Sequence, residues 1–516
     1  MTGCPIEITP YDQSGRIKTP ELININYTCQ DFWSLRNRLR DLIKERFADE
    51  FNDFVESSLA IMLIENWSFI ADMLSFKIDQ IANEIFIDTV SEVDNAFRLS
   101  LLVGFKPLPP IASRSSWIAE INNILDTDLS IDTPVIIDIT TEAGPTTIEL
   151  FAADNNKVPI FGDPILIPAG SFRNSTIVGL EGRTRTDAHA GTGEVNQFYR
   201  LSFGPVIWGS VRLSVDGTMW DQVDYFTDSQ PRREYRVEYD ANYNAYILFG
   251  NNRAGISPSV GSQIQIIYRT GGGVVGNIVT GSVELQRNYL VPGLDFRAPV
   301  TFRNYTRGEF GYDGDSIEDI KRKLPAYLRT QDRVVTSDDF DTFVNQFSTP
   351  YNGIIGKATS TVRNYGCAAN IIDIYILARD GTDGLIEASN DLKVALQQAL
   401  ETKKMMTDLI CIKDGEIIEV DVSIDLILDK FYRKFEDQFR EQVLRKVNIF
   451  FSLNNWDYNR DLKTIDIVKE ISDIKEIRTV SMNFTTDDEN NSGEMVSAGF
   501  YQIIRPQTIE VNFVYE

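Results

Sequence analysis

The chain of 516 residues is poor in the residue types that most catalytic and metal sites require. Its single histidine, His189, excludes mechanisms built on a histidine pair and histidine-rich metal sites. Because His189 stands in a polar stretch with glycines close by, we expect a solvated loop position. The four cysteines are too few and too scattered for a disulfide framework or a zinc site, so we expect free thiols at Cys4, Cys29, Cys367 and Cys411.

Long apolar runs and positive charge are also scarce. No run of about 18 apolar residues is evident, so we expect no membrane span. The first residues lack the basic and apolar segments of a signal peptide, which predicts assembly in a cytoplasm. The formal net charge is −25, from 75 acidic and 50 basic residues. Such a surface repels nucleic acid and anionic lipid, and it favours solubility and partners with basic faces.

Composition and periodicity divide the chain into five segments. We predict an extended arm over 1–30, a helical region over 31–110, a β-rich domain over 111–194, a second β-rich domain with a glycine-rich motif over 195–302, and an α+β domain over 303–516. The predicted fold class is α+β and multidomain. It has long N-terminal helices, central β-rich domains and a C-terminal α/β sandwich of β-α-β units.

The helical region is apolar on nearly every side. One set of apolar residues follows a 3.6-residue period from Val55 to Ile85, and a second set, which includes Ile61 and Phe76, lies on the other faces. An amphipathic surface helix needs only one apolar stripe. Either this helix is buried within its own domain or it is buried partly by other chains. We favour the second explanation, because no neighbouring segment before residue 110 looks large enough to cover it.

Three consecutive glycines, Gly271, Gly272 and Gly273, follow an alternating strand over 264–268. Their spacing fits neither of the two glycine-rich phosphate-binding motifs, and no helical pattern opens on the last glycine. Glycine permits φ > 0 and close approach of another backbone. We therefore predict a bulge or crossing where sheets pack, with at least one glycine at positive φ or packed against a neighbouring backbone, and no bound phosphate.

Carboxylates among glycines invite a hydrolase interpretation of Glu309, Asp313 and Asp315. Two carboxylates can act as acid and base, but catalytic pairs need a pocket that separates their pKa values. An exposed glycine-rich turn gives no such pocket, and Asp315 is more simply a helix-entry residue beside Ser316. The other acidic clusters lack the spacing of a calcium loop. We predict no catalytic, cofactor-binding or metal-binding residue.

The C-terminal segment alternates between helices and strands. Ser316 and Thr336 are each followed three residues later by an aspartate, which predicts two helix starts, and Pro325 should limit the first helix. Beyond them we expect strands over 371–378, 416–428, 478–484 and 508–514, and helices over 385–402, 434–451 and 464–471.

Several motifs, taken in order, resemble the signature of the baseplate J-like family, the wedge proteins of contractile phage tails and related injection machines. The Tyr268–Ile278 stretch carries the glycines. Tyr246–Pro258 with Gly261 is similar to the family's "FGDG…G…P…G" turn, although Asn251-Asn252 replaces the usual Asp-Gly. The segment from Gly308 to Phe340 is similar to "GG.D.ES……P..LRT.DRAVT..D[YF]". Ala82–Thr89 and Leu102–Pro107 match the family's N-terminal helices and following loop.

The resemblance implies a structural baseplate wedge subunit without enzymatic activity or cofactor. It implies two copies per wedge, N-terminal helices that join a scaffold wedge protein in a helical bundle, and C-terminal domains that contact each other. The resulting ring surrounds the hub, meets sheath-initiator-like proteins, and switches shape to trigger sheath contraction. The expected location is the tail baseplate of a virion assembled in the host cytoplasm, without nucleic-acid or membrane partners.

Two alternatives remain open at this point. One is a tail-associated glycan hydrolase that uses Glu309 with Asp313 or Asp315. The other is the equivalent wedge subunit of a bacterial contractile injection or secretion apparatus.

Overall fold

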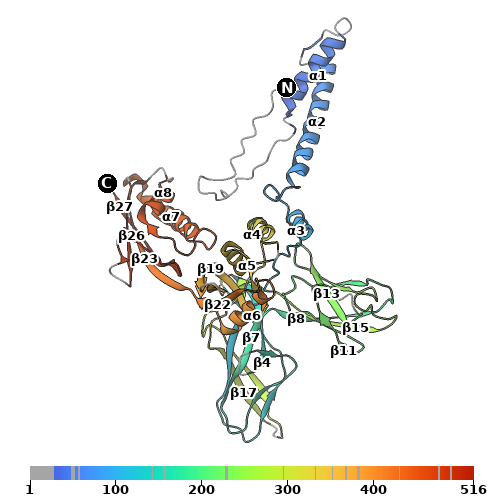
Figure 1. The fold of residues 1–516 in the computed structure, drawn as a ribbon, viewed down its shortest axis with the longest axis vertical. Helices are drawn as coiled ribbons and strands as arrows, with labels where there is room; N and C mark the ends of the chain where they lie inside the picture. Colours follow the sequence, from blue (N-terminus) through green and yellow to red (C-terminus); the bar gives the residue numbers. More distant parts are fainter. Residues whose placement is uncertain are drawn as a thin grey trace. The chain divides into compact units, whose positions relative to one another are not determined.

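The computed structural model describes residues 28, 30–47, 53–55, 58–141, 143–154, 158–226, 231–293, 296–331, 333–350, 352–365, 369–380, 384–428, 430–472, 474, 477–487 and 491–515 (Figure 1). The predicted arm over 1–30 therefore lies almost wholly outside the described residues. The chain forms two compact units, one of residues 1–107 with 315–325 and one of residues 108–314 with 326–516.

The first unit is helical. Its helices are α1 (Phe32–Arg46), α2 (Leu59–Asn83), α3 (Val93–Leu102) and the first part of α4 (Ile317–Thr330). Asp31 starts α1 with a capping box, since its carboxylate accepts from the Ser34 N–H at 2.7 Å and its own N–H donates to the Ser34 hydroxyl at 3.0 Å. The predicted N-terminal helices are confirmed.

Helix α4 begins where the sequence predicts and continues further than expected. Ser316 and Asp319 cap it reciprocally, because the Asp319 N–H donates to the Ser316 hydroxyl and the Ser316 N–H donates to the Asp319 carboxylate. Pro325 lies inside the helix, so the expectation that it limits this helix is wrong. Proline removes one backbone donor, but the helix accommodates that loss and ends at Thr330.

Helix α2 is long and apolar enough to cross a membrane by length and composition, although only 22% of its most apolar window is buried. The expectation that the chain has no membrane span stays a prediction. A single helix of this kind is weak evidence for insertion, because the core helix of a water-soluble protein passes the same test. Glu65 and Asp72 interrupt its apolar residues, and carboxylates at those positions are costly in lipid.

The second unit contains a seven-stranded sheet that curls toward closure. Six strands follow the order β16-β17-β1-β7-β4-β3, and β5 pairs with β4. Arg287 on β16 donates to the Ile136 carbonyl of β3 at 2.6 Å, so the two ends of the sheet meet. Alternate side chains fill its interior around Trp117 and Phe302. The strands are β16 (Glu284–Leu290), β17 (Arg297–Asn304), β1 (Arg114–Ile121), β7 (Arg173–Glu181), β4 (Gly144–Ala153), β3 (Val135–Thr141) and β5 (Pro159–Ile160). A separate pair joins β2 (Leu129–Ile131) to β6 (Ile165–Ile167).

Between β7 and β16 the chain builds two four-stranded sheets, which we call the inserted module, residues 183–270. One sheet has the order β11-β10-β15-β8 and the other β12-β13-β14-β9, and their inner faces share one apolar core. The strands are β8 (Arg183–Ala190), β9 (Phe198–Arg200), β10 (Arg212–Val215), β11 (Thr218–Met219), β12 (Asp221–Gln222), β13 (Glu234–Tyr239), β14 (Ala245–Phe249) and β15 (Gln263–Thr270). Strands β13 and β14 pair antiparallel, with Tyr235 opposite Phe249.

The C-terminal part contains two further sheets, each with its own helices. The five-stranded sheet joins β18 (Ser348–Thr349), β19 (Gly353–Tyr365), β20 (Ala369–Asp380), β21 (Gly384–Ile386) and β22 (Asp408–Asp414), and its core includes α5 (Ser337–Gln346) and α6 (Asn390–Glu401). The three-stranded sheet has the order β25-β23-β27 and packs against α7 (Glu436–Phe450) and α8 (Thr464–Ile471). Its strands are β23 (Glu416–Leu428), β25 (Ile477–Thr486) and β27 (Gln502–Tyr515), and a small pair joins β24 (Leu462–Lys463) to β26 (Met495–Val496).

The mixed α and β composition agrees with the predicted fold class, but the C-terminal detail is only partly as expected. β20, α6 and the parallel strand β22 form one β-α-β unit. In the last sheet, β23 pairs antiparallel with β25 and parallel with β27, which does not confirm a sandwich built of such units. Thr336 and Asp339 form the predicted capping box of α5. The five domain boundaries stay a prediction.

Candidate functional site

Helix α2 packs against α1, and its buried side mixes two isoleucines with polar residues. Within the unit, its buried residues are Ile61, Ile64, Ser68, Ser75 and Asn83. An ion pair fastens the two helices, with Arg36 Nε 2.9 Å from Glu65 Oε1. The apolar bulk of α2 therefore points away from its neighbour in the hairpin, which inverts the usual arrangement of a helix in a water-soluble protein.

Helix α2 carries eleven large apolar side chains that are each 48% to 68% exposed. Nine of them fall into two rows with the three- and four-residue spacing of a coiled-coil seam, and each row has one position that is not apolar. The first seam consists of Leu63, Trp67, Ile70, Leu74 and Ile81. The second seam consists of Met62, Phe69, Met73 and Phe76. At about 100° per residue, the two seams and the α1-facing side lie roughly 120° apart. Helix α2 thus has three packing faces, and α1 covers one of them.

A second candidate is the crossing of four chain segments at the triple glycine, which we call the glycine joint: residues 110–113, 181–182, 271–276 and 308–313. Gly271, Gly272 and Gly273 have φ of 122°, 90° and 125°, so the predicted positive φ is confirmed. A Cβ on Gly272 would lie 2.7 Å from Pro110 Cβ. A Cβ on Gly311 would lie 2.3 Å from the Gly273 carbonyl oxygen. Only glycine allows these backbones to approach so closely.

The N–H groups of the four residues from Gly271 to Val274 each donate within the chain. The Gly271 and Gly273 N–H groups donate to the carbonyls of Pro205 and Ile111, at 3.1 Å each. The Gly272 N–H donates to the Glu181 carboxylate at 2.7 Å, and the Val274 N–H donates to the Asp313 carboxylate at 2.9 Å. Successive N–H groups can form an anion-binding nest. Here two of the chain's own carboxylates occupy the positions that a phosphate would need.

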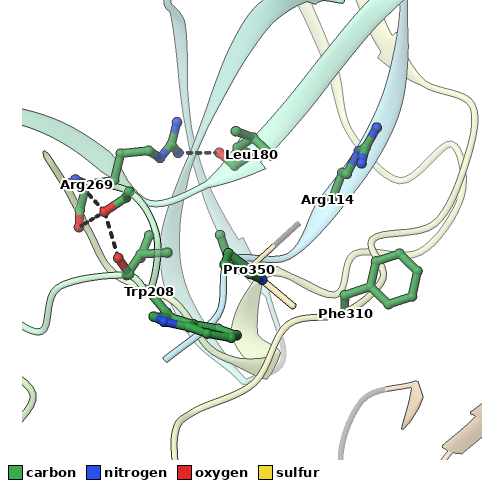
Figure 2. A pocket seen from close by; sticks show the side chains of 9 residues that line it. Arg114, Leu180, Trp208, Arg269, Phe310 and Pro350 are labelled. Atoms are coloured by element: carbon green, nitrogen blue, oxygen red, sulfur yellow. Dashed lines mark hydrogen bonds between the residues drawn. The ribbon is translucent and has the colours of Figure 1, made fainter. Parts of the chain in front are cut away.

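A buried arginine holds the two strands that enter and leave the inserted module. Arg269 Nη2 donates to the carbonyls of Leu180, Glu181 and Gly182 at 2.9 to 3.2 Å, and Nη1 lies 3.2 Å from Glu149 Oε2. Figure 2 shows the Arg269 side chain reaching toward Leu180. Burial raises the pKa of Glu181 to about 6, although hydrogen bonds from Thr146 and Gly272 and the charge of Arg269 oppose the rise. Sequence reasoning missed this network, because its partners are far apart in the chain and no local motif joins them.

A cavity near the joint has a volume of only about 20 Å³, room for roughly one water molecule. Figure 2 shows Arg114, Trp208, Phe310 and Pro350 around it. Burial lowers the pKa of Arg114, although Asp154, Asp391 and Glu309 oppose that shift. None of the three carboxylates considered for hydrolysis lines this cavity.

The three carboxylates each have a structural partner. Asp313 accepts from Val274, as described above, and the Glu309 carboxylate lies 3.3 Å from Arg307 Nε. Asp315 belongs to the first unit, where its carboxylate lies 2.5 Å from Lys323 Nζ and is 1% exposed. The described residues thus give the hydrolase interpretation no support. The prediction that the chain has no catalytic, cofactor-binding or metal-binding residue stays a prediction.

The expectation for the histidine is wrong, and the expectation for one cysteine is confirmed. His189 lies on strand β8, where its ring stacks on Tyr199 with the ring centroids 4.8 Å apart, so the expected solvated loop position is wrong. Pairing of β8 with β15 places this polar stretch in a sheet. Cys411 is a free, half-buried thiol on β22, as expected. Cys4, Cys29 and Cys367 lie outside the described residues.

Helices α1, α2 and α3 are also where similarity to a known family appears. Residues 31–102 match the family described as bacteriophage baseplate protein, N-terminal domain. The match includes both seams of α2 and supports a baseplate-type structural protein. It covers well under half of the chain, and it does not extend to the finer baseplate J-like assignment.

Comparison with other proteins adds little to that match. No curated protein matches the sequence. One similar solved chain comes from the cryo-EM structure of the anti-feeding prophage baseplate, with 10% identity, a TM-score of 0.34, and coverage of 91% of this chain and 90% of that one. Another comes from the TssK-TssF-TssG baseplate subcomplex of the type VI secretion system, with 11% identity, a TM-score of 0.27, and coverage of 69% and 96%. Both TM-scores are low, so neither likeness establishes a shared fold.

Proposed function

We propose that this chain is a structural wedge subunit of a contractile-tail baseplate, and that α2 is the central helix of a bundle completed by helices of other chains. The observation that carries the proposal is the pair of exposed seams on α2, within residues 31–102. Exposed apolar patches of this extent on water-soluble proteins mark interaction sites. A seam of large apolar side chains at coiled-coil spacing fits a partner helix.

The two seams differ in chemistry, which supports two different partner helices. The first seam is built of leucine, isoleucine and tryptophan, and the second of methionine and phenylalanine. Two identical partners would need two equivalent faces. We therefore assign one seam to a second copy of this chain and the other to a scaffold wedge protein, as the family resemblance implies. Contacts with hub and sheath-initiator-like proteins, and a place in the virion tail baseplate, belong to the same proposal.

The net charge fits this role. A charge of −25 keeps copies soluble before assembly and favours partners with basic faces. The mechanism is a change of interface geometry in a ring of subunits and requires no chemical step.

The test is co-expression of the full chain with a candidate scaffold subunit, with mass and stoichiometry measured by light scattering. We expect a stable complex that contains two copies of this chain. Replacing Trp67 by Asp should prevent formation of the complete complex, by releasing one of its two partners, while the β-rich sheets stay folded, because Trp67 is 66% exposed in the isolated chain. Asn37→Asp on the exposed side of α1 introduces the same charge and serves as the control. A Trp67→Asp chain that still assembles would contradict the proposal.

A further inference from the structure

One sheet of the inserted module has a partly exposed outer face that is composed like a protein interface. Alternation along β9, β13 and β14 turns Tyr199, Tyr235, Ile247 and Phe249 toward the core of the module. The residues between them face outward. We call these residues the exposed sheet face, in which Phe198, Arg200 and Glu238 are exposed and Arg236, Tyr246 and Leu248 are half-buried. The Arg236 guanidinium also lies over the Tyr225 and Phe226 rings, at 5.9 and 5.8 Å from their centroids.

The strand register arranges these six side chains in two rows across the sheet. In one row, Arg200 is paired with Tyr246, and Tyr246 with Glu238. In the other row, Phe198 is paired with Leu248, and Leu248 with Arg236. Phe198 is 69% exposed. Interfaces are enriched in aromatic residues and arginine over the rest of the surface.

The charges on this face are incompletely matched within the chain. Arg236 lies 2.8 Å from Glu238, whereas Arg200 makes no ion pair in the described part of the chain and lies over the Tyr246 ring at 5.9 Å. Residues 183–270 contain nine arginines, no lysine and nine acidic residues. The module is therefore neutral in a chain of net charge −25, and it is a place where two copies can approach without strong repulsion.

We propose that this face binds the same face of a second copy of the chain. Each row is self-complementary about a two-fold axis that lies in the interface, runs along the strands and passes over Tyr246. That rotation places Arg200 against Glu238 of the second copy and Tyr246 against its own equivalent. In the other row it places Phe198 against Arg236, a cation–π pair, and Leu248 against Leu248. This is an isologous contact between two aligned sheets.

Six side chains per copy place the contact at the small end of specific interfaces. It is weak alone, and it gains strength when other contacts hold many copies together. The inference rests on the proposed function in one respect only: assembly brings copies of the chain close together. The contact lies outside the helical bundle of α2, so either can fail without the other.

The test is sedimentation of the purified full-length chain over a range of concentrations and ionic strengths. We expect reversible dimers that weaken with salt. Arg200→Glu and Glu238→Arg should each weaken dimerisation at least about tenfold, because each places like charges opposite one another across the axis. The double variant Arg200→Glu with Glu238→Arg should restore dimerisation. It exchanges the two charges, so each copy again places a positive charge opposite a negative one.

Two controls separate this contact from other effects. Arg253→Glu makes the same charge change on an exposed turn of the module and should leave dimerisation unchanged. Trp67→Asp removes the first α2 seam and should also leave this contact intact. A monomeric wild-type chain at the highest soluble concentration overturns the inference, as does a double variant that fails to restore dimers although it folds. If Trp67→Asp removes all dimers and Arg200→Glu removes none, the exposed sheet face is not the dimer interface. The proposed α2 bundle would still be supported.

Discussion

At the scale of single residues, the chain uses glycine and buried charge to join its sheets. The glycine joint places four backbones closer than any side chain would allow, and two carboxylates satisfy its N–H groups. Arg269 and its carboxylate and carbonyl partners then fix the strands that enter and leave the inserted module. These groups have structural roles, and the free energy of unfolding of suitable variants tests each role.

Gly272→Val should lower the free energy of unfolding by at least about 2 kcal/mol. The φ of 90° strains any β-branched residue, and the new Cβ would lie 2.7 Å from Pro110 Cβ. Thermal and denaturant unfolding of the full chain measure the loss. Gly261→Ala is the matched control, because Gly261 also has a positive φ of 77° but faces open space. Equal losses at the two positions would mean that close packing at the joint contributes nothing.

Glu181 should make stability depend on pH in an unusual direction. Burial raises its pKa from 4.5 to about 6, so the folded chain binds a proton at a pH where the unfolded chain does not. Its contribution to stability therefore increases as pH falls from about 6 to 4.5, by at most about 2 kcal/mol. The difference in unfolding free energy between wild type and Glu181→Gln should follow this curve between pH 7.5 and 4.5. A difference that is flat across the range would show that Glu181 does not titrate there.

At the scale of elements, α2 departs from the rule for surface helices. Its buried side includes Ser68 and Ser75, and most of its large apolar residues are exposed. Because the two seams lie on different sides, substitutions in them should have separable effects.

We expect Trp67→Asp to release one partner and Phe69→Asp to release the other, since these residues lie in different seams and are 66% and 57% exposed. Pull-down of a tagged copy, measured separately for an untagged copy and for the scaffold subunit, distinguishes the two losses. Both chains should retain the circular dichroism of the wild type. If either substitution removes both partners equally, the two seams form a single interface.

At the scale of the whole molecule, the inserted module is a branch that the chain enters and leaves at one place. Thr184 on β8 pairs directly with Arg269 on β15, next to the glycine joint. The chain on either side of the module belongs to the same seven-stranded sheet. The module should therefore be removable without disturbing the rest of the chain.

Replacing residues 185–268 by an Asn-Gly turn should give a chain that folds and still forms the α2 bundle. Thr184 and Arg269 are strand partners, so a two-residue turn can connect them, and the contacts of Arg269 at the joint remain. This chain should lose the dimerisation assigned to the exposed sheet face. Light scattering with the scaffold subunit and sedimentation alone measure the two properties. Aggregation of the shortened chain in place of folding would show that the seven-stranded sheet depends on the module.

The sequence alone determined several parts of this protein, because the physics involved is local. Capping pairs located the starts of α4 and α5, helical periodicity located α2, and three glycines in a row required an unusual backbone conformation. The motif order pointed to a baseplate-type protein, and the all-round apolar character of the first helices predicted that other chains partly bury them.

Only the tertiary structure decided the rest, because it depends on residues distant in the chain. Pairing of β8 with β15 placed His189 in a strand, and α4 continues past Pro325. The packing of α1 decided which side of α2 is covered, and the strand register put Arg200, Tyr246 and Glu238 in one row. Local sequence carries no record of such pairings, since the free energy that selects them arises only when the strands and helices meet.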